Sequence, residues 1–174
     1  MFTRIDPDHR HVSRRSSVYA RNVVAASQPL AAQAGLQAIR NGGNAVDAAI
    51  ATAITLTVVE PTMNGIGSDG FVIVADNCGI HGFNGSGRSP TAWTPERFAG
   101  LPAMPEYGWD TITVPGAVDT WVRLSERFGR LPFERLFEDA IGYATNGYAV
   151  SPVVARGWAR AAEEYGHFDG FRTT

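Results

Sequence analysis

The sequence predicts an α+β fold, and three features of its 174 residues support that prediction. Several segments carry apolar residues at helical spacing between a capping residue and a terminating glycine or asparagine. Two short apolar runs, Phe71–Ala75 and Ile80–Phe83, flank the turn Asp76–Gly79 and so predict a β-hairpin. The hydrophobic share of 44% is sufficient for one domain with a core.

Composition argues against several classes of function. The net charge of −2 disfavours binding to nucleic acid or to an anionic membrane surface, since both need clustered positive charge. No stretch reaches the roughly 18 apolar residues of a membrane span, and the polar N-terminus lacks the apolar segment of a signal peptide. The single cysteine, Cys78, excludes an internal disulfide and a multi-cysteine metal site. We expect no metal, no nucleic-acid or membrane partner, and a reducing cytoplasmic location.

The N-terminal third is predicted to contain an arm, a strand and two helices. Residues 1–17 are polar and are expected to form a flexible N-terminal arm. Val18–Ala26 is a candidate strand, and Pro29–Arg40 is a candidate helix that an Asn-Gly-Gly run ends. Asn44 then caps a second helix, with Asp47 near its exposed amides.

From Ala48 to Val59 this second helix contains no charged residue. A helix of this kind is buried on most sides, and its small residues permit close approach to neighbouring elements. The following Gly65–Gly70 segment matches the dinucleotide fingerprint GxGxxG, but the fingerprint needs a preceding strand and a following helix, and here that order is reversed. We therefore interpret the segment as a turn in which the backbone passes close to another element.

The loop after the hairpin, Asn84–Pro90 (NGSGRSP), carries the candidate substrate-binding residues Ser86 and Arg88. Its glycines expose backbone amides, and a guanidinium binds a carboxylate through two hydrogen bonds, so the loop suits a carboxylate or amide substrate. A strand-end turn whose arginine pairs with a surface acid explains the same residues equally well on local grounds.

The remaining chain is predicted to be mainly helical. The predicted parts are a surface excursion at Thr91–Tyr107, a short strand at Thr111–Val114, and helices beginning near Pro115, Pro132 and Pro152.

Trp121 and Trp158 are expected to anchor the core, and Gly166–Thr174 has no predicted regular structure. The scattered histidines and serines form no self-sufficient catalytic set, because neither HExxH nor G-x-S-x-G occurs. The chain therefore looks like a globular piece that holds part of a site.

Five motifs follow one another in the order GGNAVDAAIATAITLTVVEP, GIGSDGF, GSGRSP, TVPGAVDTW and FGRLPFERLFEDAIGYATNGYAVSP. Together they closely resemble the N-terminal part of the large subunit of the gamma-glutamyltransferase family, over roughly residues 22–160. The resemblance implies an N-terminal-nucleophile hydrolase fold, a four-layer αββα sandwich of which only the N-terminal portion is present. Residues 18–174 are then a partial large-subunit domain.

The resemblance also implies a mechanism whose nucleophile lies outside this chain. In such proteins a precursor cuts itself, and the freed N-terminal threonine of the small subunit is both nucleophile and, through its α-amine, base. The implied partners are a small-molecule amide substrate and the small subunit from the same precursor, with no metal or organic cofactor. Thr173 and Thr174 have no free amine, so we expect no catalytic residue in this chain and no activity from the chain alone.

The substrate is where the sequence departs from its relatives. In gamma-glutamyl enzymes of this family, an arginine four residues before the proline of this loop binds the glutamyl α-carboxylate. That position is Ser86 here, and Arg88 lies two residues later. The loop looks more like the acylase and oxamate-amidohydrolase branches, so hydrolysis of a small amide is at least as well supported as glutathione chemistry. A noncatalytic or truncated relative is the remaining alternative.

Overall fold

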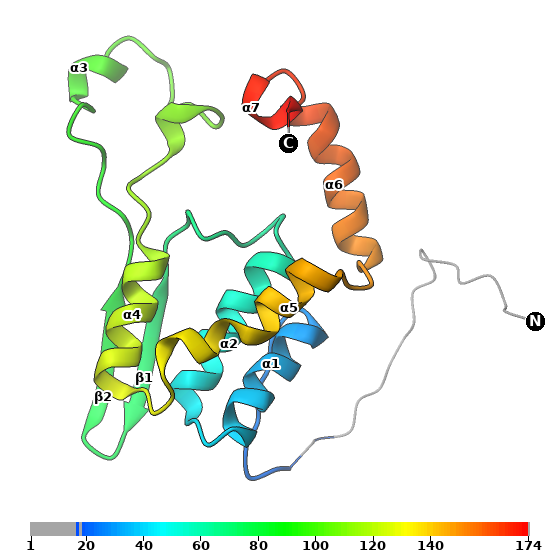
Figure 1. Cartoon of the computed structure of the whole chain (residues 1–174). Helices are drawn as coiled ribbons and strands as arrows, with labels where there is room; N and C mark the ends of the chain where they lie inside the picture. Colours follow the sequence, from blue (N-terminus) through cyan, green and yellow to red (C-terminus); the bar gives the residue numbers. More distant parts are fainter. Residues whose placement is uncertain (1–16, 18, 174) are drawn as a thin grey trace, which may run out of the picture.

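The computed structural model describes residue 17 and residues 19–173. The predicted arm at 1–17 lies outside the described residues apart from Ser17, as do Val18 and Thr174. The described elements, in chain order, are α1 (Pro29–Arg40), α2 (Ala45–Val59), β1 (Phe71–Asp76), β2 (Gly79–Asn84), α3 (Pro95–Phe98), η1 (Trp109–Thr111), α4 (Ala117–Phe128), η2 (Phe133–Phe137), α5 (Glu138–Asn146), α6 (Pro152–Tyr165) and α7 (Asp169–Arg172) (Figure 1).

Helices α1 and α2 pack side by side, joined by a short turn. The Asn44 side chain accepts hydrogen bonds from the amides of Val46 and Asp47, and the Asp47 carboxylate accepts one from the Asn44 amide at 2.8 Å. This reciprocal capping box fixes the start of α2. In the turn before it, Gly42 has a φ of +95°, which favours glycine. The predicted helix at Pro29–Arg40 and the predicted cap at Asn44 are confirmed.

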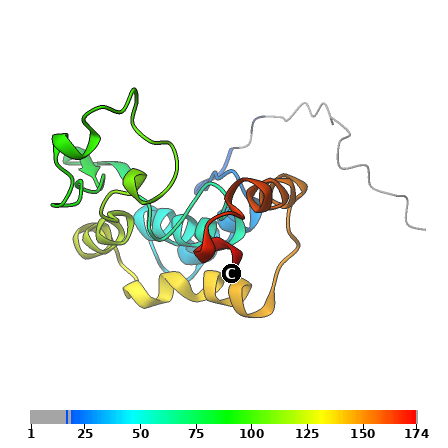
Figure 2. The same ribbon diagram turned by 90° about the horizontal axis from the view of Figure 1, so that it is seen from above.

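Helix α2 lies at the centre of the core. Side chains on several of its faces, including Ile50, Ile54 and Thr55, are at most 2% exposed. On one side α1 approaches so closely that a Cβ on Gly35 would overlap the Thr52 hydroxyl. Helices α4, η2 and α5 pack against the other sides, as Figure 2 shows from above. The prediction of a helix buried on most sides is confirmed.

The predicted hairpin is also confirmed, with β1 and β2 antiparallel and Asp76 opposite Gly79. One face is partly buried against the core through Val72, Val74 and Phe83. The other face is exposed at Phe71, Ile73 and Ile80, by 67%, 79% and 78% respectively.

Two predicted strands are wrong. Tyr19–Ala26, the described part of the Val18–Ala26 candidate, forms no strand, and neither does Thr111–Val114, which begins in η1. A strand needs a neighbour that pairs with its backbone groups. In the part of the chain that the structure describes, only β1 and β2 pair in this way.

Apart from the strand predicted at Thr111–Val114, the C-terminal half differs from the prediction in three places. The segment after Pro132 begins as the 3-10 helix η2 before continuing as α5. Trp121 is buried as predicted, but the prediction for Trp158 is wrong, because that side chain on α6 is 48% exposed. Gly166–Thr174 contains the short helix α7. Among the described side chains of α6, only Val154, at the start of the helix, is fully buried. The later turns of α6 therefore lie outside the main core.

Candidate functional site

The Asn84–Pro90 loop is joined to the glycine turn and to the start of α4 through backbone hydrogen bonds. Gly85 and Gly70 exchange two of them, with N–O distances of 2.8 and 3.3 Å, which extends the pairing of the hairpin. The Ser68 carbonyl oxygen accepts two more from the amides that open α4, each at 3.0 Å. The GxGxxG segment therefore connects the loop to α4, in agreement with its interpretation as a close-packed turn.

Two glycines set the backbone of the loop against its neighbours. A Cβ on Gly85 would overlap the buried hydroxyl of Thr120, and a Cβ on Gly87 would overlap the Val114 carbonyl oxygen. The Val114 amide donates a hydrogen bond to the Arg88 carbonyl oxygen at 2.9 Å. The main chain on both sides of Ser86 is therefore held in place, and only a residue without a side chain fits at these contacts.

The two predicted binding side chains, Ser86 and Arg88, both lie exposed on this loop. The Ser86 amide donates to the Asn84 side-chain oxygen at 3.0 Å, an interaction that shapes the turn. Among residue 17 and residues 19–173, no acid forms an ion pair with the Arg88 guanidinium. The alternative of a surface ion pair at Arg88 therefore has no support in the described residues.

Ser86 and Arg88 line a cavity of about 640 Å³ whose other side is formed by the first turns of α4. Two charged residues of α4, Asp119 and Arg123, line the same cavity and form an ion pair, with Arg123 Nε 2.8 Å from Asp119 Oδ2. Sequence analysis did not identify these two residues as functional. Their spacing places them on one helix face, but nothing local indicates that this face meets the loop.

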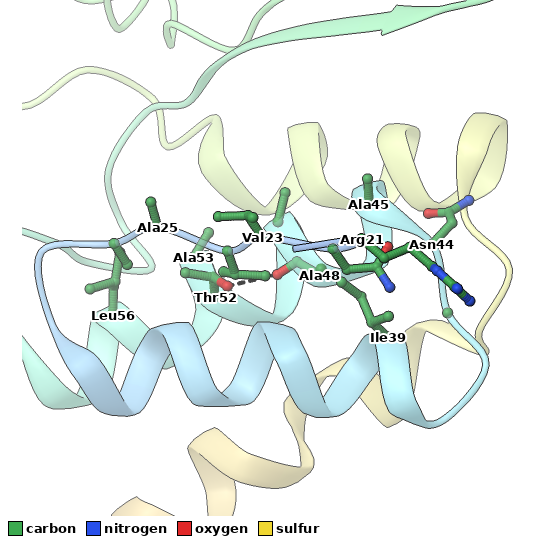
Figure 3. A pocket seen from close by; sticks show the side chains of 15 residues that line it. Arg21, Val23, Ala25, Ile39, Asn44, Ala45, Ala48, Thr52, Ala53 and Leu56 are labelled. Atoms are coloured by element: carbon green, nitrogen blue, oxygen red, sulfur yellow. Dashed lines mark hydrogen bonds between the residues drawn. The ribbon is translucent and has the colours of Figure 1, made fainter. Parts of the chain in front are cut away.

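Two other cavities are lined mainly by apolar side chains. Figure 3 shows the first, of about 570 Å³, between the segment at 21–26 and α2, with Val23, Ala48 and Ala53 among its lining residues. The hydrogen bond drawn there, from the Thr52 hydroxyl to the Ala48 carbonyl oxygen at 2.7 Å, lies within α2. The second, of about 950 Å³, lies between the end of the Thr91–Tyr107 excursion and helices α6 and α7 and is largely aromatic.

The described residues contain no group of three or more His, Cys, Asp or Glu side chains arranged to hold a metal ion. None of the described helices is long and apolar enough to cross a membrane. The Thr173 hydroxyl donates to the carbonyl oxygens of Asp169 and Gly170, at 3.1 and 3.3 Å, so this group closes the end of α7.

The helical core, the hairpin and the glycine-rich loop together define part of an N-terminal-nucleophile hydrolase fold. A sequence model of one family within that class, described as gamma-glutamyltranspeptidase, matches residues 31–173. The chain belongs to the gamma-glutamyltranspeptidase family. The family resemblance predicted from the five sequence motifs is thereby confirmed.

Three relatives show the breadth of this family. The glutathione hydrolase-like YwrD proenzyme of Bacillus subtilis is 39% identical over 140 residues, which are 79% of this chain and 27% of that protein. The oxamate amidohydrolase proenzyme of Klebsiella pneumoniae is 39% identical over 166 residues, which are 91% of this chain and 31% of that protein. The crystal structure of a cephalosporin acylase from Bacillus halodurans has a TM-score of 0.75 at 46% identity, covering 88% of this chain and 31% of the other. The chain thus spans 27% to 31% of the length of these relatives.

Proposed function

We propose that the whole protein breaks an amide bond through a covalent intermediate on an N-terminal threonine that lies outside this chain. Family membership and the description of two relatives as proenzymes support this proposal. The threonine hydroxyl attacks the amide carbonyl carbon while its own α-amine takes the proton. The C–N bond then breaks, and the amine leaves with that proton. Water or an acceptor amine attacks the resulting ester, releases the acyl group and frees the threonine.

In this proposal the chain is the first part of a large subunit, and a small subunit arises from the same precursor by self-cleavage. The exposed apolar face of the hairpin, with Phe71, Ile73 and Ile80, supports it. A second sheet packed on this face would build the central layers of a four-layer αββα sandwich and remove the apolar surface from water, at about 25 cal/mol per Å². The chain alone lacks the threonine, so it is expected to be inactive.

The proposed binding role of this chain rests on Arg88, whose backbone is fixed while its guanidinium has no acidic partner among the described residues. Its backbone is held by the contacts at Gly87 and Val114, and its exposed guanidinium has no acidic partner among the described residues. Such a guanidinium binds a carboxylate through two parallel hydrogen bonds. We assign Arg88 to a carboxylate of the substrate, with the Ser86 hydroxyl as a neighbouring hydrogen-bonding group in the same cavity.

The substrate class that these groups favour is a small amide that carries a carboxylate. Ser86 occupies the position at which gamma-glutamyl enzymes carry their carboxylate-binding arginine, and this difference favours hydrolysis of an acidic amide over gamma-glutamyl transfer. Similarity to an oxamate amidohydrolase and to a cephalosporin acylase supports the same choice. Gamma-glutamyl compounds are the second candidate, supported by similarity to a glutathione hydrolase-like protein.

Mass spectrometry and an amide panel test the proposal on the whole protein. Two chains in place of one precursor mass are expected, the second beginning with threonine. Oxamate, glutaryl amides, gamma-glutamyl amides and neutral acetyl amides are then compared for hydrolysis and transfer. An unprocessed precursor that turns over none of these amides would refute the proposed function and leave the noncatalytic relative.

A variant pair tests the binding role within the same assay. Arg88→Ala is expected to raise KM for acidic amides by about 10- to 100-fold, with a smaller change in kcat, because a charge-assisted hydrogen-bonded pair is lost. Arg135→Ala is the matched control, since it removes an exposed arginine that does not line the cavity. An unchanged KM in Arg88→Ala would show that this side chain does not bind the substrate.

A further inference from the structure

We propose that Arg123 on α4 is a second substrate-binding cation, which completes with Arg88 an anion subsite for half-amides of dicarboxylic acids. This inference rests on the proposed function and extends it, because it names the substrate class and a specificity residue outside the glycine-rich loop. Arg88 and Arg123 come from separate elements and line the same cavity of about 640 Å³.

The packing of α4 on the loop explains how Arg123 reaches this cavity. Thr120, one turn before Arg123, is 3% exposed and occupies the space beside Gly85 that a side chain would fill. The Thr120 hydroxyl also donates to the Gly116 carbonyl oxygen at 2.9 Å, which holds its rotamer. The α4 face that begins at Thr120 is therefore pressed against the loop, and Arg123 follows on that side of the helix.

The charges in the cavity favour an anion. Its lining includes Arg88, Arg123 and Asp119 as charged residues, which leaves one positive charge in excess. The start of α4 lines it as well, but its first amides, of Gly116 and Ala117, already donate to the Ser68 carbonyl oxygen, so the side-chain charges carry this argument. These charges would attract an acidic substrate, while a neutral analogue would gain little affinity from them.

The contact with Asp119 orients Arg123 without occupying all of its donors. The ion pair joins the Nε atom to Asp119 Oδ2 at 2.8 Å, and no described residue accepts a hydrogen bond from either terminal nitrogen of Arg123. A guanidinium has five N–H donors, so an edge stays available for a carboxylate. Both side chains are largely exposed, at 67% and 63%, and such a pair contributes little to stability. The role of this pair is to orient the Arg123 guanidinium rather than to stabilise the fold.

Paired substrates and paired variants test the inference in the whole, processed protein. Hydrolysis of glutaramate is compared with hydrolysis of its methyl ester, which lacks the free carboxylate. Arg123→Ala is expected to raise KM for glutaramate by about 10-fold with little change in kcat, and to leave KM for the ester unchanged. Arg123→Lys is expected to restore part of the affinity, since lysine retains the charge without the planar fork.

A binding measurement separates this role from an effect on the chemical step. Titration calorimetry with glutarate, the product of the same hydrolysis, should show a Kd raised by a similar factor in Arg123→Ala. The control is again Arg135→Ala, which removes the arginine of another exposed ion pair, with Glu138, outside the cavity. It should match the wild type in both assays.

The outcomes distinguish the inference from the function on which it rests. If the wild type hydrolyses acidic amides but Arg123→Ala has the same KM and Kd, then the assignment of Arg123 is wrong and the proposed function stands. If KM rises equally for the acid and the ester, Arg123 supports the fold of the cavity and does not bind the carboxylate. If the wild type hydrolyses no amide, both proposals fall together.

Discussion

Replacing Asp47 by alanine is expected to disconnect α2 from the turn that follows α4. The carboxylate is 0% exposed and accepts hydrogen bonds from three backbone amides, those of Asn44 at 2.8 Å, Arg130 at 3.1 Å and Leu131 at 3.3 Å. The last two amides lie 83 and 84 residues further along the chain. One buried side chain therefore caps α2 and also fixes the α4–η2 turn against it.

The size of the effect follows from the number of amides left without an acceptor. Each buried amide without a partner costs about 1–3 kcal/mol, and entering water relieves part of that, so Asp47→Ala should lower the free energy of unfolding by about 3–5 kcal/mol. For a chain of this length, the loss corresponds to a fall in Tm of about 6–20 °C. Asp47→Asn keeps the shape and one acceptor oxygen, so about 1–3 kcal/mol is expected.

Urea unfolding followed by circular dichroism measures both variants. The control is Asp169→Ala, which removes a carboxylate that is 90% exposed and paired with Arg172 on the surface. It should change the free energy of unfolding by less than about 1 kcal/mol. A loss equally small in Asp47→Ala would refute the reasoning, because the three amides would then be satisfied without this side chain.

Three further predictions concern the loop and two surface contacts. Gly87→Ala forces a methyl group onto the Val114 carbonyl oxygen and should raise KM for acidic amides far more than Gly142→Ala on α5, where a methyl group meets nothing within 4 Å; equal KM values in the two variants would contradict this. A hydrogen bond to the Glu164 carboxylate raises the pKa of Tyr107 to about 12, so this contact is present below pH 10.0 and is lost as the pH rises through about 12. Ultraviolet titration should show the pKa lowered toward 10.0 in Glu164→Gln, and an unchanged titration would refute the assignment. A hydrogen bond from the Cys78 backbone amide lowers the pKa of Asp76 below 3.8. The ionised Asp76 carboxylate therefore stabilises the hairpin turn above pH 3.8, and this contribution is lost as the pH falls through the lowered pKa. An Asp76 pKa above 3.8 in an NMR titration would contradict this.

The elements that sequence analysis predicted correctly depend on interactions between near neighbours in the chain. The capping box of Asn44 and Asp47 spans one helical turn. The hairpin follows from two apolar runs on either side of a turn in which Asp76 accepts hydrogen bonds from the next amides. The glycine-rich loop with Ser86 and Arg88 is equally local; carboxylate binding by these two residues stays a prediction.

The errors concern elements whose fate depends on distant parts of the chain. Tyr19–Ala26 and Thr111–Val114 have strand-like sequences, but a strand forms only where another strand pairs with it. Trp158 was expected in the core because tryptophan is large and apolar, yet its position is set by where α6 lies relative to the helical bundle. Neither the presence of a pairing strand nor the position of α6 is encoded within a few residues of the segment concerned.

The sequence by itself determined the family, the principal helices with their caps, the hairpin and the residue types of the Ser86–Arg88 loop. Only the tertiary structure decided that the Asp47 carboxylate binds the amides of a distant turn and that Arg123 shares a cavity with Arg88. The physical reason is the separation along the chain over which each interaction acts. Capping, turn formation and helical periodicity act over a few residues. The Asp47 contact, by contrast, exists because α4 packs against α2, and Arg123 meets the loop because the glycines there let the two backbones approach.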